Sequence, residues 1–131
     1  MKTSKAAKPL PCPCGSVSYA DCCGRYHAGD AAPSAEALMR SRYSAYVLRL
    51  SPYLMATWHP DTRPASLDLD EDACQWIGLQ VLSHARQDDS RATVAFVARY
   101  RINGRAHRLS ELSRFVRQDG RWLYVDGDTG S

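Results

Sequence analysis

Four cysteines lie within twelve residues near the start of the 131-residue chain: Cys12, Cys14, Cys22 and Cys23. In a reducing compartment, clustered thiols are more often metal ligands than disulfide partners. Cys12 and Cys14, and likewise Cys22 and Cys23, are too close in sequence for an unstrained disulfide. Four thiolates can close a tetrahedral zinc site, which leaves no open position for chemistry. We therefore predict one structural Zn ion bound by these four cysteines.

Neighbouring residues bear on this prediction. Gly15 permits a tight turn in which backbone N–H groups point at sulfur. His27 follows Cys23 by four residues and is an alternative ligand. The fifth cysteine, Cys74, stands alone and is expected to be a small buried apolar residue.

The composition is typical of a globular protein, with 44% hydrophobic and 24% charged residues. No apolar run approaches the roughly 18 residues needed to span a bilayer. The first ten residues contain three lysines and no apolar stretch of a secretory signal, so we expect a cytoplasmic protein. The net charge of +3 comes from 17 basic and 14 acidic groups. Such a mixed balance predicts neither a membrane nor a nucleic acid as partner.

The spacing of apolar residues divides the chain into three parts. Residues 1–11 have the composition of a flexible tail, residues 12–29 form a Cys- and Gly-rich knot, and residues 34–127 form a larger domain. Apolar residues recur every three to four positions from 35 to about 50. This period predicts a helix, and Ser34 is suited to cap its first turn.

Further elements follow this helix. Pro52 can open a second short helix, and the acidic stretch 68–72 predicts the start of another. The period then changes from 3.6 to 2, which predicts strands around 77–81, 92–102, 105–117 and 121–126. Asn103-Gly104 and Asp119-Gly120 are typical of tight hairpin turns. Helices followed by a meander predict an α+β fold, with helices packed on one face of a curved antiparallel sheet.

The cysteine-rich segment resembles the SEC-C motif, the small zinc-binding module at the C-terminus of the preprotein translocase ATPase SecA. The residues that carry the resemblance are Cys12-Pro-Cys14-Gly15-Ser16, Tyr19 and Cys22-Cys23. Only seven residues separate Cys14 from Cys22, one fewer than is usual in the motif. This departure leaves open which of Cys22, Cys23 and His27 complete the tetrahedron.

Other segments resemble the YchJ family of bacterial proteins. They are residues 38–46, 53–54, 57–60, 96–100, 113–115 and 120–127. The resemblance implies a SEC-C knot followed by a domain with the cone-shaped nuclear transport factor 2-like (NTF2-like) fold. That fold agrees with the predicted order of helices and strands. The family usually has a His-Glu pair ahead of the Ser-Arg-Phe string, whereas this chain has Ser110-Glu111.

A cone-shaped fold implies a pocket between the sheet and its helices. Our candidates for its lining are Arg40, Tyr43, Trp58, His59, Trp76, Glu111, Arg114 and Trp122. His59 could serve as a general base, but no carboxylate partner is identifiable by spacing, which favours a helix-terminating role. Tryptophans are more often core residues than ligand contacts.

The charged candidates have similar alternatives. Arg40 and Arg42 flank the tyrosines of the predicted helix, and an arginine fork suits a carboxylate or phosphate ligand. Arginines beside an apolar helix face are, however, usually a solvated flank. Glu111 and Arg114 are three residues apart on a strand, so we expect them on opposite faces.

Two classes of function follow from these features. The first is a zinc-containing binding or adaptor protein whose knot contacts a protein partner. The resemblance implies this role, because the SecA tail is associated with the export chaperone SecB and with ribosomes. The alternative is a small-molecule-binding protein or enzyme that uses the pocket, with His59, Glu111 and Arg114 as polar members. The sequence contains no phosphate-binding glycine loop, nucleophile elbow or zinc-protease helix.

Overall fold

Helices precede strands in the chain, as the sequence predicts. The computed structural model describes residues 10–67, 69 and 74–129. The helices are α1 (Cys23–His27), α2 (Ala35–Leu48) and α3 (Ser51–Ala56). The strands are β1 (Gln75–Arg86), β2 (Arg91–Ile102), β3 (Arg105–Gln118) and β4 (Arg121–Thr129), which pair antiparallel in the order β1-β2-β3-β4. This arrangement confirms the predicted α+β class.

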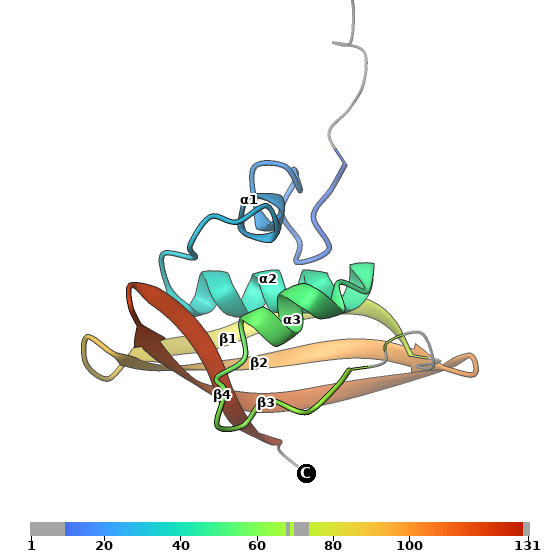
Figure 1. Ribbon diagram of the computed structural model, residues 1–131. Helices are drawn as coiled ribbons and strands as arrows, with labels where there is room; N and C mark the ends of the chain where they lie inside the picture. Colours follow the sequence, from blue (N-terminus) through green and yellow to red (C-terminus); the bar gives the residue numbers. More distant parts are fainter. Residues whose placement is uncertain (1–9, 68, 70–73, 130–131) are drawn as a thin grey trace, which may run out of the picture.

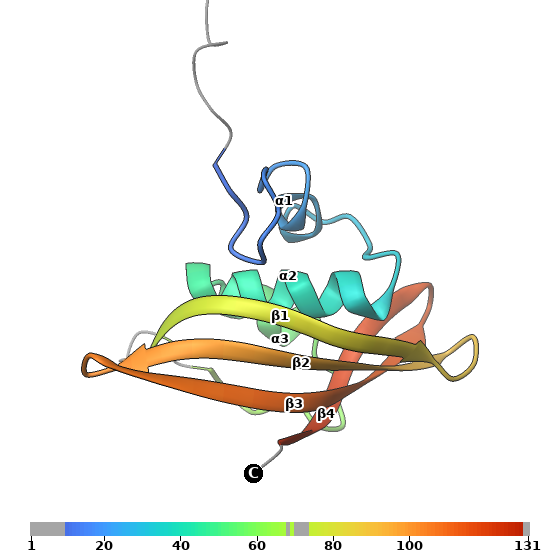
Figure 2. The ribbon, with the colours of Figure 1, turned by 180° about the vertical axis from the view of Figure 1, so that it is seen from behind.

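Helix α2 is the central element of the fold. It begins after Ser34, whose extended backbone and side-chain oxygen, accepting from Ala37 N–H, form the predicted cap. It ends where Arg49 adopts a left-handed conformation with φ 60°. In Figures 1 and 2, α2 lies across one face of the sheet, with α3 beside it and the knot on its other side. One helix therefore contacts the sheet and the knot at once.

The sheet is curved, and its turns and bulges explain how. Asn103-Gly104 and Asp119-Gly120 have positive φ at both residues, as tight hairpin turns require. Register shifts interrupt the pairing of β1 with β2 at two places, and that of β3 with β4 after Arg114. Bulges of this kind bend and twist strands. Figure 1 shows the result, in which β4 rises out of the sheet beside α2, which it contacts.

The core lies between α2 and the concave face of the sheet. Val94, Ala98 and Phe115 from the strands meet Leu38 and Met39 from the helix, and all five are buried. The alternation of these residues along the strands is the period of two that the sequence shows.

Some predictions concern residues outside those described. Of the predicted tail, the structure describes only Leu10 and Pro11. Of the acidic stretch 68–72, it describes only Leu69. The short helix α1 was not predicted, because five residues are too few to show a helical period. Within the described ranges, no helix has the length and apolar character needed to cross a membrane.

Candidate functional site

The four cysteines of the knot (residues 12–29) converge on one point. Their sulfur atoms all lie within 4.8 Å of one another. The Cys14 and Cys22 sulfurs are 3.6 Å apart, and those of Cys22 and Cys23 are 3.9 Å apart. Zinc–sulfur bonds of about 2.3 Å in a tetrahedron place sulfur atoms about 3.8 Å apart. The thiols therefore have the spacing that a tetrahedral metal ion requires.

The local sequence explains this convergence. Gly15 has a φ of 116°, and its N–H donates to the Cys12 carbonyl at 3.0 Å. The chain then reverses, and the Cys12 N–H donates to the Ser16 carbonyl at 2.9 Å. Cys22 and Cys23 arrive from the other side, where Cys23 is the first residue of α1. Two short segments thus present two thiols each.

The thiols perturb one another. The pKa of Cys14 is lowered to about 5, chiefly by a hydrogen bond from Cys23, and the same bond raises the pKa of Cys23. Burial raises the pKa of Cys22. Without an ion, the cluster therefore favours a thiolate at Cys14 beside protonated thiols at Cys22 and Cys23. A divalent cation would stabilise the remaining thiolates, which is the chemistry of a structural metal site.

His27 is engaged elsewhere. Its Nε2 lies 2.8 Å from the Ser41 carbonyl, and its Nδ1 lies 2.6 Å from the Tyr19 hydroxyl. The carbonyl can only accept, so Nε2 carries the proton and Nδ1 accepts from Tyr19. Burial lowers the pKa of His27, in keeping with a neutral ring. Both ring nitrogens are used, so the four cysteines form the candidate ligand set without it.

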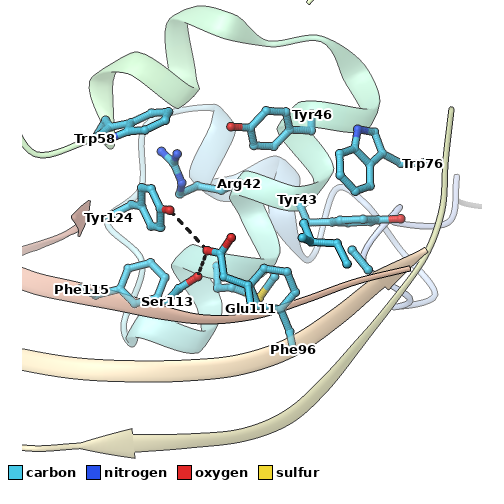
Figure 3. A pocket seen from close by; sticks show the side chains of 13 residues that line it. Arg42, Tyr43, Tyr46, Trp58, Trp76, Phe96, Glu111, Ser113, Phe115 and Tyr124 are labelled. Atoms are coloured by element: carbon cyan, nitrogen blue, oxygen red, sulfur yellow. Dashed lines mark hydrogen bonds between the residues drawn. The ribbon is translucent and has the colours of Figure 1, made fainter. Parts of the chain in front are cut away.

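A second site lies on the opposite side of α2. Between this helix and the concave face of the sheet is a cavity of about 230 Å³ (Figure 3). Its walls are mostly aromatic and apolar. The lining residues are Met39, Arg42, Tyr43, Tyr46, Trp58, Trp76, Phe96, Ala98, Leu109, Glu111, Ser113, Phe115 and Tyr124.

Arg42 is the charged residue of the helical wall, and it is only 5% exposed. Its Nη1 donates to the Leu54 carbonyl at 2.8 Å and to the Thr57 hydroxyl at 2.7 Å. Its guanidinium carbon lies 4.9 Å from the ring centre of Trp58 and 4.6 Å from that of Tyr124. No described carboxylate lies within 4.0 Å of it. Burial lowers the pKa of Arg42, yet a guanidinium remains charged at neutral pH.

Glu111 is the charged residue of the sheet wall. Its Oε2 accepts hydrogen bonds from the hydroxyls of Ser113 and Tyr124, as the dashed lines of Figure 3 show. Burial raises the pKa of Tyr124, and the negative charge of Glu111 raises it further. Gly127 on β4 makes room for this carboxylate, because a Cβ there would collide with it. Figure 3 shows Arg42 and Glu111 pointing into the cavity from different walls.

Four of the predicted pocket residues line this cavity: Tyr43, Trp58, Trp76 and Glu111. The indole N–H of Trp58 is buried and has no acceptor among the described residues. Tyr43 and Trp76 meet edge to face, with ring centres 6.0 Å apart. Tyr43 comes from α2, Trp58 from the connection that follows α3, Trp76 from β1 and Glu111 from β3. They are far apart in sequence, and only folding brings them together.

The other four predicted residues lie outside the cavity. Arg40 pairs with Glu36 at 2.9 Å, on the side of α2 that faces the knot. Trp122 is buried, with the Arg86 guanidinium over its ring. Arg114 extends from the opposite face of β3 to Asp126 and Asp128, as its spacing from Glu111 predicts.

His59 does not terminate α3, which ends at Ala56; it lies in the connection that follows, and its ring bonds no backbone carbonyl among the described residues. Its backbone N–H donates to the Tyr124 carbonyl at 2.8 Å, and its Nδ1 accepts from the Asp61 N–H at 3.0 Å. The ring nitrogen Nε2 lies 3.1 Å from the Gln118 side-chain amide. These contacts fix the segment after α3 against β4, and they place no base in the cavity.

The interpretation of Arg42 as a solvated flank is wrong. Arg42 follows Met39 by three residues and precedes Tyr46 by four, so it belongs to the buried stripe of α2. This spacing is the sequence signal that identifies it. Tyr124 gives a weaker signal, because an aromatic residue in a strand is ordinary core.

Three comparisons place the chain among known proteins. A family model described as the middle NTF2-like domain of YchJ matches residues 34–127. A UPF0225 protein of Ralstonia nicotianae is 58% identical over 134 residues, covering 93% of each chain. One from Bordetella parapertussis is 57% identical over 126 residues, covering 93% of this chain and 95% of that one.

Solved structures are similar as well. The solution structure of a SEC-C motif-containing protein of Rhodopseudomonas palustris has a TM-score of 0.82 at 36% identity. It covers 93% of this chain and all of that chain. The crystal structure of a SEC-C motif-containing protein of Psychrobacter arcticus has a TM-score of 0.78 at 29% identity, covering 95% of this chain and 85% of that one. An NTF2-like domain behind a SEC-C segment is therefore the architecture of this chain.

Proposed function

The chain belongs to the YchJ-like family of UPF0225 proteins, and we propose that it is a zinc protein that binds a small organic molecule. In this proposal the four cysteines hold one structural zinc ion, and the cavity beneath α2 is the functional site. The observation that carries the proposal is Arg42, a buried guanidinium in an aromatic cavity, with no carboxylate of the described residues within 4.0 Å.

The cysteine geometry supports the zinc ion. Zinc accepts four thiolates in a tetrahedron, and the knot offers four thiols at compatible distances. Metal analysis of the purified protein is expected to find one zinc per chain, lost in Cys12→Ser and Cys14→Ser. A native protein without zinc, in which all four thiols react freely with a thiol reagent, would contradict this assignment.

The charges in the cavity support a ligand. Removing a charge from water costs several kcal/mol unless partners replace the water. Arg42 has only partial replacement, and a bound molecule would supply the rest. Glu111 shares the cavity without forming an ion pair with Arg42, so both charges remain available. Apolar concave sites with a few polar groups of this kind are typical of small-molecule binding.

A thermal-shift screen of small aromatic compounds tests the cavity. A compound at one hundred times its Kd stabilises the folded state by about 2.7 kcal/mol, which raises the Tm by several degrees. In Ala98→Leu, a larger side chain fills the cavity, and we expect the shift to disappear. The matched control is Ala95→Leu, three residues earlier on the opposite face of β2, which should keep the shift. Equal shifts in both variants would place the binding elsewhere.

The knot also supports a second candidate, contact with a protein partner. Leu10 and Val17 are 76% and 85% exposed, and both belong to or adjoin the knot. The Tyr19 N–H donates to the Leu10 carbonyl at 2.8 Å, so the two segments run side by side, and exposed apolar side chains are a feature of docking surfaces. Capture from bacterial lysate by the full chain and by the double variant Leu10→Ser, Val17→Ser tests this role. Identical sets of captured proteins would exclude docking through these side chains.

A further inference from the structure

We infer that the cavity takes a single-ring aromatic carboxylic acid that carries a hydroxyl or amino group away from its carboxylate. This inference rests on the proposed function, because it names the class of molecule that the same cavity would bind.

Size and wall chemistry limit the ligand to one ring. Sites for drug-sized molecules occupy roughly 300–1,000 Å³, and this cavity of about 230 Å³ is smaller. Tyr43 and Trp76 line the end away from Arg42 in Figure 3, and Phe96 lines the wall beside Glu111. Aromatic rings pack against one another edge to face or offset, so such walls favour a flat aromatic body.

The donors around Arg42 select a carboxylate. Two of the five guanidinium N–H groups go to Leu54 and Thr57. The other three have no carbonyl or carboxylate acceptor among the described residues. Arg42 also makes a side-chain hydrogen bond to the Tyr46 hydroxyl, which lies at this end of the cavity in Figure 3, so this hydroxyl takes one of the three remaining N–H groups. An arginine fork with spare N–H groups matches the geometry and charge of a carboxylate better than that of a neutral acceptor.

The acceptor on the opposite wall selects a donor. Glu111 uses Oε2 to accept from Ser113 and Tyr124, while Oε1 receives no hydrogen bond from a described residue. A ligand hydroxyl or amino group would satisfy this oxygen. The carboxylate of the ligand and that of Glu111 would repel each other at short range, and this repulsion fixes the orientation of the ligand. Its carboxylate faces Arg42, and its donor faces Glu111.

Four probes test the assignment, with binding measured by calorimetry and by tryptophan fluorescence. They are 4-hydroxybenzoate, 4-aminobenzoate, benzoate and phenol. Benzoate lacks the donor and phenol lacks the carboxylate, so each removes one of the two contacts. We expect the two substituted benzoates to bind on the order of tenfold more tightly than benzoate, and on the order of a hundredfold more tightly than phenol.

Variants assign the contacts to residues. Arg42→Lys keeps the charge but removes the fork, and we expect it to weaken 4-hydroxybenzoate by tenfold or more while changing phenol little. Glu111→Gln should reduce the advantage of 4-hydroxybenzoate over benzoate. The matched control is Arg40→Lys, which alters the same helix outside the cavity and should change neither. Because Arg42 also anchors Leu54, zinc content and circular dichroism establish that each variant is folded.

The outcomes separate the two proposals. If phenol binds the wild-type protein as tightly as 4-hydroxybenzoate, the assigned class is wrong, although the cavity still binds small molecules. If no probe and no compound of the thermal-shift screen binds, the proposed function itself is wrong. Unchanged selectivity in folded Arg42→Lys would also overturn the inference, because the carboxylate would then be recognised elsewhere.

Discussion

The knot and the cavity lie on opposite sides of α2 and are built in opposite ways. The knot takes its four thiols from twelve consecutive residues, and a metal ion is what would hold them together. The walls of the cavity come from α2, from all four strands and from the segment after α3. Hydrophobic packing holds these elements together. A local site can thus be predicted from the spacing of its residues in the sequence. A site made by tertiary contacts can be predicted only if the face of the helix or strand that each side chain occupies is known.

The two regions are connected through a few residues of α2. Ser41 accepts from His27 through its carbonyl, and Ser44 lies 3.5 Å from the Cys12 sulfur. Arg42 and Tyr43, on the other side of the same turns, line the cavity. Because α2 carries residues of both regions, variants of decreasing effect can test whether the cavity depends on the knot.

Cys14→Ser has the largest expected effect. Loss of a metal site removes much of the free energy of binding that stabilises the fold around it, so the free energy of unfolding should fall by about 4 kcal/mol or more. Chemical denaturation and metal analysis measure the two losses. Limited proteolysis should then cut within residues 12–29, while the sheet and α2 remain protected because they have their own core.

The control for this variant is Cys74→Ser. Cys74 lies outside the cysteine cluster, so zinc content should stay at one per chain. If Cys14→Ser instead exposed the strands to protease as early as the knot, the two regions would form one cooperative unit. Their apparent independence would then be wrong.

The difference between the regions also explains what the sequence could predict. The four cysteines, the cap at Ser34 and the two hairpin turns depend on residues close in sequence, and each lies in the expected place. The pocket residues depend on helix phase and strand face. Arg40 and Arg42 differ by two positions, which is about 200° around a helix, so one faces the knot and the other faces the cavity.

His59 illustrates a second reason why prediction fell short. A histidine is suited to catalysis, and His59 was a pocket candidate, but it lies three residues beyond the end of α3, where it contacts the Asp61 N–H, the Gln118 side chain and the Tyr124 carbonyl outside the cavity. Conversely, nothing in the sequence around Tyr124 predicts its contacts with Arg42 and Glu111. The bulge after Arg114 sets the register in which Tyr124 of β4 pairs with Phe115 of β3, and no local sequence pattern predicts a bulge.

Two glycine variants compare the regions at an intermediate size of effect. Gly15 has φ 116° with open space around it, so Gly15→Ala imposes backbone strain alone. Gly127 has no such φ, but a Cβ there collides with Glu111, so Gly127→Ala imposes crowding alone. Each should cost about 1–3 kcal/mol in urea denaturation. Gly15→Ala should weaken zinc retention, and Gly127→Ala should weaken ligand binding.

Each of these two variants serves as the control for the other. Zinc retention against a chelator should be normal in Gly127→Ala, and the probe affinities should be normal in Gly15→Ala. A variant that disturbed both readouts would show that strain passes through α2 from one side to the other.

His27→Phe addresses the connection itself. Phenylalanine keeps the edge-to-face contact with Tyr53 and loses the hydrogen bonds to Tyr19 and Ser41. The Ser41 carbonyl and the Tyr19 hydroxyl then lack these partners, at a cost of about 1–2 kcal/mol in the free energy of unfolding. We expect thermal unfolding to begin earlier, with the affinity for 4-hydroxybenzoate unchanged. A weaker affinity would contradict the view that His27 only attaches the knot.

Arg114→Gln has the smallest expected effect, because Arg114 and its partners are exposed at the far face of β3. The guanidinium holds the pKa of Asp128 below its ordinary value through a hydrogen bond. A lowered pKa in the folded state adds stability above the ordinary Asp pKa, and this addition is lost as the pH falls through the lowered value. In Arg114→Gln, NMR titration should show the pKa of Asp128 rising toward its ordinary value. Zinc content and probe binding at neutral pH should both stay unchanged, and a loss of ligand binding would mean that this face of the sheet belongs to the site.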